Sequence, residues 1–247
     1  MPESVRMWVE ISFNLTYLVA IWGLVIAMRR NRSMVAAEDR RVADLFLWAF
    51  TLLALGDTGH VGFRVLAYAL GGLETDISVL GLQLGLVGVG ALATAITVTF
   101  FYVLMLEIWR ARFDKAYGWL GYLLLGAAAA RLLLMLPAPN QWNSVVPPQP
   151  WSIIRNLPLM VQGLGVAYLI LRDARTAQDR TFTWIGVMIL ISFACYMPVI
   201  FFVQQAPITG MLMIPKTLAY VAIAVLAYQD LYGAERTAIV ARTPRAS

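Results

Sequence analysis

The sequence predicts an all-α integral membrane protein, a single bundle of seven transmembrane helices with the N-terminus outside and the C-terminus cytoplasmic. Of its 247 residues, 60% are hydrophobic and only 13% are charged, and the mean hydropathy is +0.72. This composition is far from that of a soluble domain. Seven apolar segments are each long enough to cross a bilayer as a helix, at residues 8–28, 42–70, 77–109, 117–136, 151–171, 182–203 and 208–229.

The orientation follows from the charges of the loops. The loops after the first, third and fifth segments carry Arg or Lys, whereas the loops after the second, fourth and sixth segments carry neither. Basic loops stay in the cytoplasm, so the net charge of +5 reports membrane orientation and not nucleic-acid binding. We therefore expect a multi-pass protein of the cell membrane, with residues 1–233 as one transmembrane domain and 234–247 as a short polar cytoplasmic tail.

The first three segments are mainly typical of helix packing. Glu10 lies near the outer end of the first segment, where it faces either the membrane interface or the interior of the bundle. The second segment is longer than the ~20 residues needed to cross, so it tilts or is kinked around its glycines Gly56, Gly59 and Gly62, which also allow close approach of a neighbouring helix. The third segment opens with glycines followed by threonines, again a packing pattern.

The last four segments contribute polar groups at their outer ends. Arg131 lies about five residues from the outer end of the fourth segment, so it either snorkels to the interface or points inward. The uncharged, proline-rich loop at 137–150 is suited to capping a pocket from outside. Arg155 and Asn156 begin the fifth segment, and Lys216 lies about eight residues inside the seventh.

The clearest departure from an apolar pattern is the stretch LGDTGHVGFRVL in the second segment, which contains Asp57, His60 and Arg64. Residues three and four apart share a face of an α-helix, so these side chains form one polar stripe about two turns long. Ionisable groups at membrane depth are costly and usually face a bundle interior or a water-filled cavity. The stripe therefore predicts a functional site with partners on other helices.

Lys216 is the second unusual residue. Among the 19 basic residues, 17 are Arg and only two are Lys, so Arg carries almost all of the positive charge of this chain. Lysine differs from arginine in having a nucleophilic amine whose pKa burial can lower. A lysine inside the last segment therefore suggests that the amine itself is used.

Together these residues predict a polar, net-positive pocket in the outer half of the bundle. Its expected ligand is an anionic small molecule or a lipid headgroup, in a receptor-like sensor or a carrier that also contacts membrane lipid, because arginine suits carboxylate and phosphate groups. The alternative is a structural network in which Asp57 pairs with Lys216 or Arg64. The predicted ligand-binding residues are Asp57, His60, Arg64, Arg155, Asn156, Lys216 and Tyr220.

Seven segments with a lysine in the last one resemble the microbial rhodopsins, whose retinal forms a Schiff base with that lysine. Phe193, Tyr196 and Pro198 are similar to the aromatic and proline pattern of that family's sixth helix. The resemblance implies retinal on Lys216 as an alternative. Two departures stand against it: Leu212 replaces the family's seventh-helix carboxylate, and the third segment lacks the characteristic Arg and acidic residues.

A third alternative is an intramembrane lipid hydrolase similar to the seven-span superfamily that includes alkaline ceramidases and lysoplasmalogenases. Asp57 and His60 are its candidate catalytic residues, as an orienting acid and a general base. The zinc histidines of the ceramidase branch are absent. With a single His and a single Cys in the chain, no metal site of the multi-histidine or cysteine type is expected.

Overall fold

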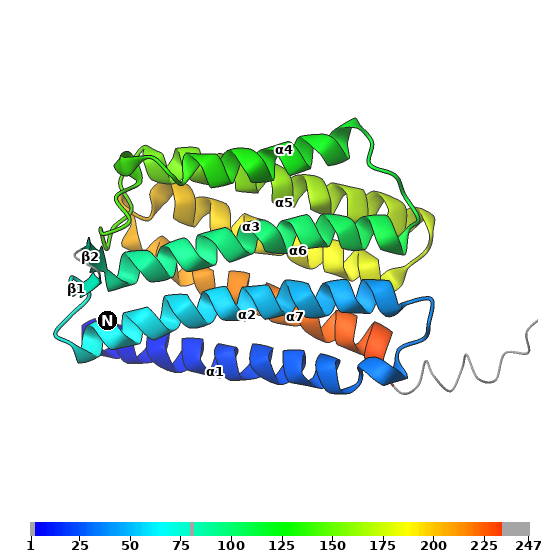
Figure 1. The fold of residues 1–247 in the computed structure, drawn as a ribbon, viewed down its shortest axis with the longest axis horizontal. Helices are drawn as coiled ribbons and strands as arrows, with labels where there is room; N and C mark the ends of the chain where they lie inside the picture. Colours follow the sequence, from blue (N-terminus) through cyan, green and yellow to red (C-terminus); the bar gives the residue numbers. More distant parts are fainter. Residues whose placement is uncertain (1–2, 80–81, 234–247) are drawn as a thin grey trace, which may run out of the picture.

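The computed structural model describes residues 3–79 and 82–233, and within them α-helices and one two-stranded sheet are joined by loops and short 3₁₀ turns. The helices run side by side along the long axis of the molecule, with α1 and α4 at opposite edges (Figure 1). The predicted tail at 234–247 lies outside the described residues. The seven α-helices are α1 (Glu3–Arg30), α2 (Arg40–Ala69), α3 (Leu86–Arg112), α4 (Trp119–Leu134), α5 (Trp151–Thr176), α6 (Arg180–Phe202) and α7 (Met213–Tyr232).

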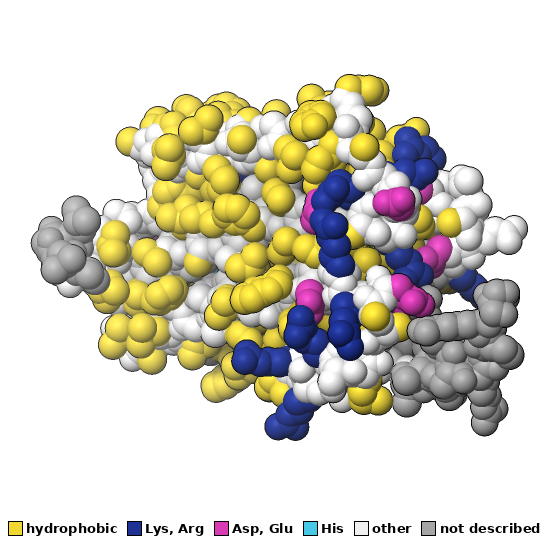
Figure 2. All heavy atoms as spheres, turned by 45° about the vertical axis from the view of Figure 1, so that its right-hand side comes forward, with side chains coloured by type: hydrophobic (Ala, Val, Ile, Leu, Met, Phe, Trp, Pro, Cys, Tyr) yellow, Lys and Arg dark blue, Asp and Glu magenta, His cyan; other side chains and the backbone are white. Residues whose placement is uncertain are grey.

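Six of these helices are long and apolar enough to cross a membrane, which makes the chain a multi-pass membrane protein. A broad hydrophobic surface covers much of the molecule, and the charged side chains gather toward one end (Figure 2). The α-helix that does not meet the length needed to cross a membrane is α4. Its 16 residues span ~24 Å at ~1.5 Å per residue, less than the ~30 Å of a bilayer's hydrocarbon. The fourth segment was predicted to be longer, at 117–136.

The third predicted segment is wrong at its start. Residues 77–79 and 82–85 are not helical but belong to the antiparallel strands β1 (Asp76–Val79) and β2 (Leu82–Gly85), and α3 begins only at Leu86. Ile77 is opposite Leu84 in the antiparallel ladder and packs against Ala67 and Leu86. The alternation of apolar and polar residues in these two short stretches is typical of strands with one buried face.

The seventh segment also begins differently from its prediction at 208. A 3₁₀ helix, η3 (Pro207–Leu212), precedes α7, so Pro215 and Lys216 are the third and fourth residues of the α-helix. Proline is tolerated in the first turn, where its missing N–H would have no intrahelical acceptor. Two other 3₁₀ turns, η1 (Arg32–Met34) and η2 (Ala138–Asn140), lie in the connections.

Close approach of α2 and α3 holds the middle of the bundle together. A Cβ atom on Gly56 would lie 2.9 Å from the Cβ of Thr97, and one on Gly90 would lie 3.0 Å from the Cα of His60. Only glycine permits helices to approach this closely. The prediction that glycines bring a neighbour against the second helix is confirmed at Gly56 and Gly59, whereas a Cβ atom on Gly62 would have nothing within 4 Å.

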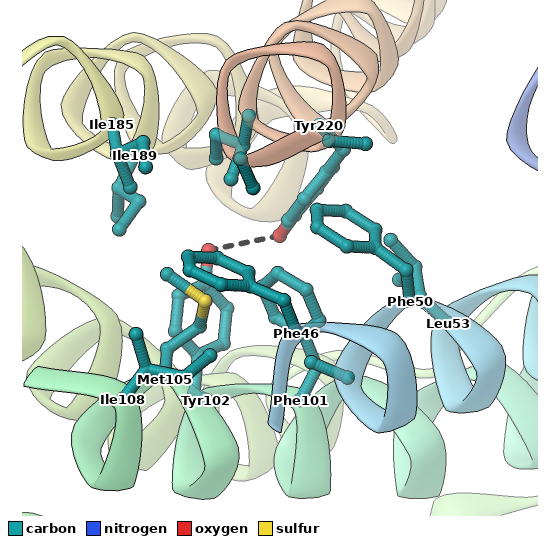
Figure 3. Close-up of a cluster of buried hydrophobic side chains, with 14 of the residues drawn as sticks. Phe46, Phe50, Leu53, Phe101, Tyr102, Met105, Ile108, Ile185, Ile189 and Tyr220 are labelled. Carbon is teal, nitrogen blue, oxygen red and sulfur yellow. Dashed lines mark hydrogen bonds between the residues drawn. The ribbon is translucent and has the colours of Figure 1, made fainter. Parts of the chain in front are cut away.

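The bundle has an aromatic core that joins three of its helices. Phe50 on α2 meets Phe101 on α3, Phe101 meets Tyr220 on α7, and the hydroxyl groups of Tyr102 and Tyr220 are 2.9 Å apart (Figure 3). Such edge-to-face pairs add a specific geometry to apolar burial. They hold α2, α3 and α7 at fixed distances from one another.

Ion pairs join the helices at the end where the charges gather. The guanidinium of Arg112 on α3 donates to Asp179, the N-cap of α6, at 2.7 Å, and to Asp39, the N-cap of α2, at 3.1 Å. It also lies 3.5 Å from Asp230 on α7 and stacks over Phe182. One side chain therefore ties four helices together at this end, and the polar residues described next lie toward the other.

Candidate functional site

Arg131 points into the bundle and not to the interface. Its side chain is 2% exposed, its Nη1 donates to Thr99 Oγ1 on α3 at 2.9 Å, and its Nη2 donates to Asn156 Oδ1 on α5 at 3.3 Å. The Nε atom is buried and has no hydrogen-bond partner. Of the two positions that the sequence left open, the structure shows the inward one.

A chain of contacts leads from Arg131 to Lys216. The hydroxyl of Tyr196 on α6 donates to the same Asn156 Oδ1, at 3.3 Å. The Nζ of Lys216 lies 4.4 Å from the centre of the Tyr196 ring and 5.6 Å from the centre of the Tyr220 ring. Cations at these distances are attracted by the ring faces. Arg131 on α4, Asn156 on α5, Tyr196 on α6 and Lys216 on α7 thus form one cluster with their hydrogen-bonding neighbours, which we call the Arg131–Lys216 cluster.

Asp57 belongs to a neighbouring part of the bundle. Its carboxylate accepts hydrogen bonds from Tyr17 on α1 at 2.6 Å and from Thr94 on α3 at 2.7 Å. Among the described residues it forms no ion pair within 4.0 Å with Lys216 or Arg64, although the charges of Asp57 and Lys216 are close enough to interact. Asp57 is therefore held by hydroxyl groups of α1 and α3.

Arg155 faces the outer loop. Its side chain is buried, its guanidinium stacks 4.2 Å from the centre of the Trp142 ring, and its Nη1 donates to Asn140 Oδ1 at 3.3 Å. Trp142 also donates from Nε1 to the carbonyl of Met135 at 2.9 Å. Arg155 and Arg131 remain close enough for their charges to repel. The loop at 137–150 therefore packs over Arg155, while its role in capping a pocket stays a prediction.

The remaining predicted residues stay on the α2 side. His60 and Arg64 are half-buried, one and two turns beyond Asp57 on the same helix. The carboxylate oxygens of Asp57, on the same helix as His60, accept hydrogen bonds from Tyr17 on α1 and Thr94 on α3. The side chain of Glu10 lies outside the described residues.

Several residues of the cluster were not predicted as site residues. Thr99 was interpreted only as helix packing, Tyr196 as part of an aromatic pattern, and Gln162 was overlooked, although its side chain is fully buried and its Nε2 donates to the Thr99 carbonyl at 3.4 Å. A single amide in the middle of an apolar segment was the available signal for Gln162. No local pattern distinguishes Thr99 from its neighbouring threonines.

The cluster carries more positive than negative charge. Arg131, Arg155 and Lys216 supply three cations, and none of them takes part in an ion pair among the described residues. A surface cavity of about 600 Å³ opens on the covering loop and is lined in part by Trp142, whose ring stacks on Arg155. Arginine and lysine side chains grouped in this way are chemically suited to binding an anion.

Comparisons with known proteins were made at three levels, and at none of them does this chain find a match: no protein-family model, no curated protein and no solved structure is similar to it.

Proposed function

We propose that the Arg131–Lys216 cluster binds the anionic group of a small molecule or a lipid headgroup, so that the protein acts as a receptor-like sensor or a carrier. The anion lies between Arg131 and Lys216, with Tyr196 and Asn156 as neutral hydrogen-bonding neighbours. Lys216 and Tyr196 are only half-buried, which leaves this side of the cluster open to a ligand.

The observation that carries the proposal is that Arg131 is buried and forms no ion pair among the described residues. It is 2% exposed, and none of the ion pairs among the described residues includes it. A buried charge without a partner costs several kcal/mol even after relaxation of the surrounding protein. Two neutral oxygens offset only part of that cost, and its Nε still lacks an acceptor.

Replacing Arg131 by methionine tests the proposal through the sign of the stability change. Methionine fills a similar volume without charge. The two acceptors keep other bonds, because Thr99 Oγ1 donates to the Ala95 carbonyl and Asn156 Oδ1 accepts from Tyr196. The substitution therefore leaves no partner of Arg131 without a hydrogen bond, and the change in stability reports whether the charge has an anionic ligand.

With a ligand bound, Arg131→Met should lose it and lower the free energy of unfolding. The loss should be about 3 to 4 kcal/mol if the ligand is present at 100 to 1,000 times its Kd. Without a ligand, removal of an unpaired buried charge should be neutral or stabilising by about 1 to 4 kcal/mol. The measurement is thermal unfolding of the purified protein in mild detergent, combined with native mass spectrometry of retained small molecules.

Arg29→Met is the matched control, because Arg29 is exposed at the end of α1 and its loss changes the net charge equally. Octanoate and glycerol phosphate, added to washed protein, then test the carboxylate and phosphate classes separately. The proposal would be contradicted by three results together: Arg131→Met protein is more stable than wild type, the wild type retains no anion, and the wild type responds to neither probe.

A further inference from the structure

A groove between α5 and α6 at the charged end of the bundle has a polarity that changes along its length. It encloses about 410 Å³ and is lined by Leu164, Leu171 and Leu190, by Tyr168, and by Arg172 and Arg175. Its α5 residues recur at intervals of three and four, which places them on one face of the helix. Leu164 and Leu190 lie deeper along the bundle, whereas Leu171 and the two arginines lie near the end of α5.

The depth of the groove matches the profile of one bilayer leaflet. Arg175 is one residue from the end of α5, whereas Leu190 is ten residues into α6, which corresponds to ~15 Å from that end at ~1.5 Å per residue. Tyr168, which lies between these levels, is 55% exposed, and Leu190 is 39% exposed. The groove thus runs from the headgroup level into the hydrocarbon and faces lipid.

The mouth of the groove carries net positive charge. Arg172 is held in place by Asp173, to which its Nε and Nη2 donate at 3.0 and 2.8 Å, while Asp173 also accepts from Trp109 Nε1 at 2.8 Å. Arg175 is exposed and takes part in none of the ion pairs formed by the described residues. Two cations and one carboxylate leave a surplus of one positive charge.

We infer that this groove binds one phospholipid with an anionic headgroup, from the leaflet at the charged end of the bundle. Its phosphate lies between Arg172 and Arg175, and an acyl chain follows the groove past Tyr168 to Leu190. Basic pockets between transmembrane helices are suited to this chemistry, because the guanidinium fork matches phosphate and the groove wall matches the chain. The site is separate from the Arg131–Lys216 cluster and does not depend on the function proposed for it.

The test compares lipids that differ only in headgroup charge. The purified protein is delipidated in detergent and titrated with dimyristoyl phosphatidylglycerol or dimyristoyl phosphatidylcholine, and the bound lipid is counted by native mass spectrometry. Wild type should bind one phosphatidylglycerol in preference to phosphatidylcholine. The double variant Arg172→Gln/Arg175→Gln should reduce that preference roughly tenfold, and Arg175→Gln alone, which leaves the Asp173 contacts intact, should reduce it several-fold.

The control is Arg29→Gln/Arg30→Gln, which removes two exposed cations from the last turn of α1 at the same end of the bundle. The control should keep the wild-type preference. An equal loss in both double variants, or an unchanged preference in Arg172→Gln/Arg175→Gln, would overturn the inference. Competition by millimolar inorganic phosphate as effective as that by phosphatidylglycerol would show a free-phosphate site and overturn the lipid assignment.

Discussion

Replacing Gly88 by alanine should detach the outer loop at 137–150 from the N-terminal end of α3. A Cβ atom on Gly88 would lie 1.2 Å from the carbonyl oxygen of Trp142 and 2.4 Å from its carbonyl carbon. Both atoms belong to the backbone, so rotation of a side chain cannot relieve the overlap. The loop has to move away by roughly 2 Å to restore van der Waals contact.

The energetic cost can be assembled from the contacts that this movement breaks. Asn143 donates from Nδ2 to the Gln83 carbonyl at 3.1 Å and accepts from the Gly85 N–H at 3.3 Å, and each bond contributes about 0.5 to 1.5 kcal/mol. The stacking of Arg155 on Trp142 contributes about 1 to 2 kcal/mol more. After subtracting a helix-propensity gain of up to about 1 kcal/mol, Gly88→Ala should destabilise the protein by about 1 to 4 kcal/mol.

Gly62→Ala provides the comparison, because a Cβ atom at that position has nothing within 4 Å. This variant should be neutral or stabilised by up to about 1 kcal/mol. Both variants are measured by thermal unfolding in the same detergent, and the exposure of the loop is followed by limited proteolysis between residues 137 and 150. The reasoning would be refuted if the Gly88→Ala and Gly62→Ala proteins unfolded at the same temperature and resisted proteolysis equally.

Three further substitutions probe other parts of the bundle. Arg112→Gln should lower the free energy of unfolding by about 3 kcal/mol because it leaves three carboxylates without their shared cation, whereas Gln at the exposed Arg180 should change it by less than about 1 kcal/mol. Tyr17→Phe should cost about 1.5 to 3 kcal/mol through a lost hydrogen bond to a carboxylate, while Tyr122→Phe, at an exposed position, should be nearly neutral in the same denaturation assay. Lys216→Arg keeps the positive charge but replaces a compact ammonium by a larger, planar guanidinium. The variant should still fold but lose its retained anion in native mass spectrometry, and with it the stability that the bound anion supplies; retention of both the anion and the wild-type stability would show that only the charge matters.

The sequence by itself was sufficient to predict that the seven helices exist, because their formation depends on local composition. The sixth apolar segment was predicted at 182–203 and α6 spans Arg180–Phe202. In a bilayer every backbone polar group must be satisfied within its own segment, so a long apolar run has few alternatives to a helix. The close approach at the glycines of α2 followed from the absence of a side chain, which is also a local property.

The strands β1 and β2 show where this local reasoning fails. The stretch at 77–85 is apolar enough to extend the third segment, but Ile77 and Leu84 pair across two strands, and Ile77 packs against the buried cluster of Ala67, Leu86 and Val87. Composition alone does not separate a short apolar strand from the start of a helix. The tertiary contact with Ala67 and Leu86 decides between them.

The candidate site depended almost entirely on tertiary structure. Arg131 was compatible with the interface or the interior until α3 and α5 placed Thr99 and Asn156 beside it, and Asp57 receives its hydrogen bonds from helices 37 and 40 residues away in the chain. A helix pattern gives the angle between its own side chains, but not the rotation of the helix against its neighbours. That rotation, set by packing, determines which buried charges meet a partner.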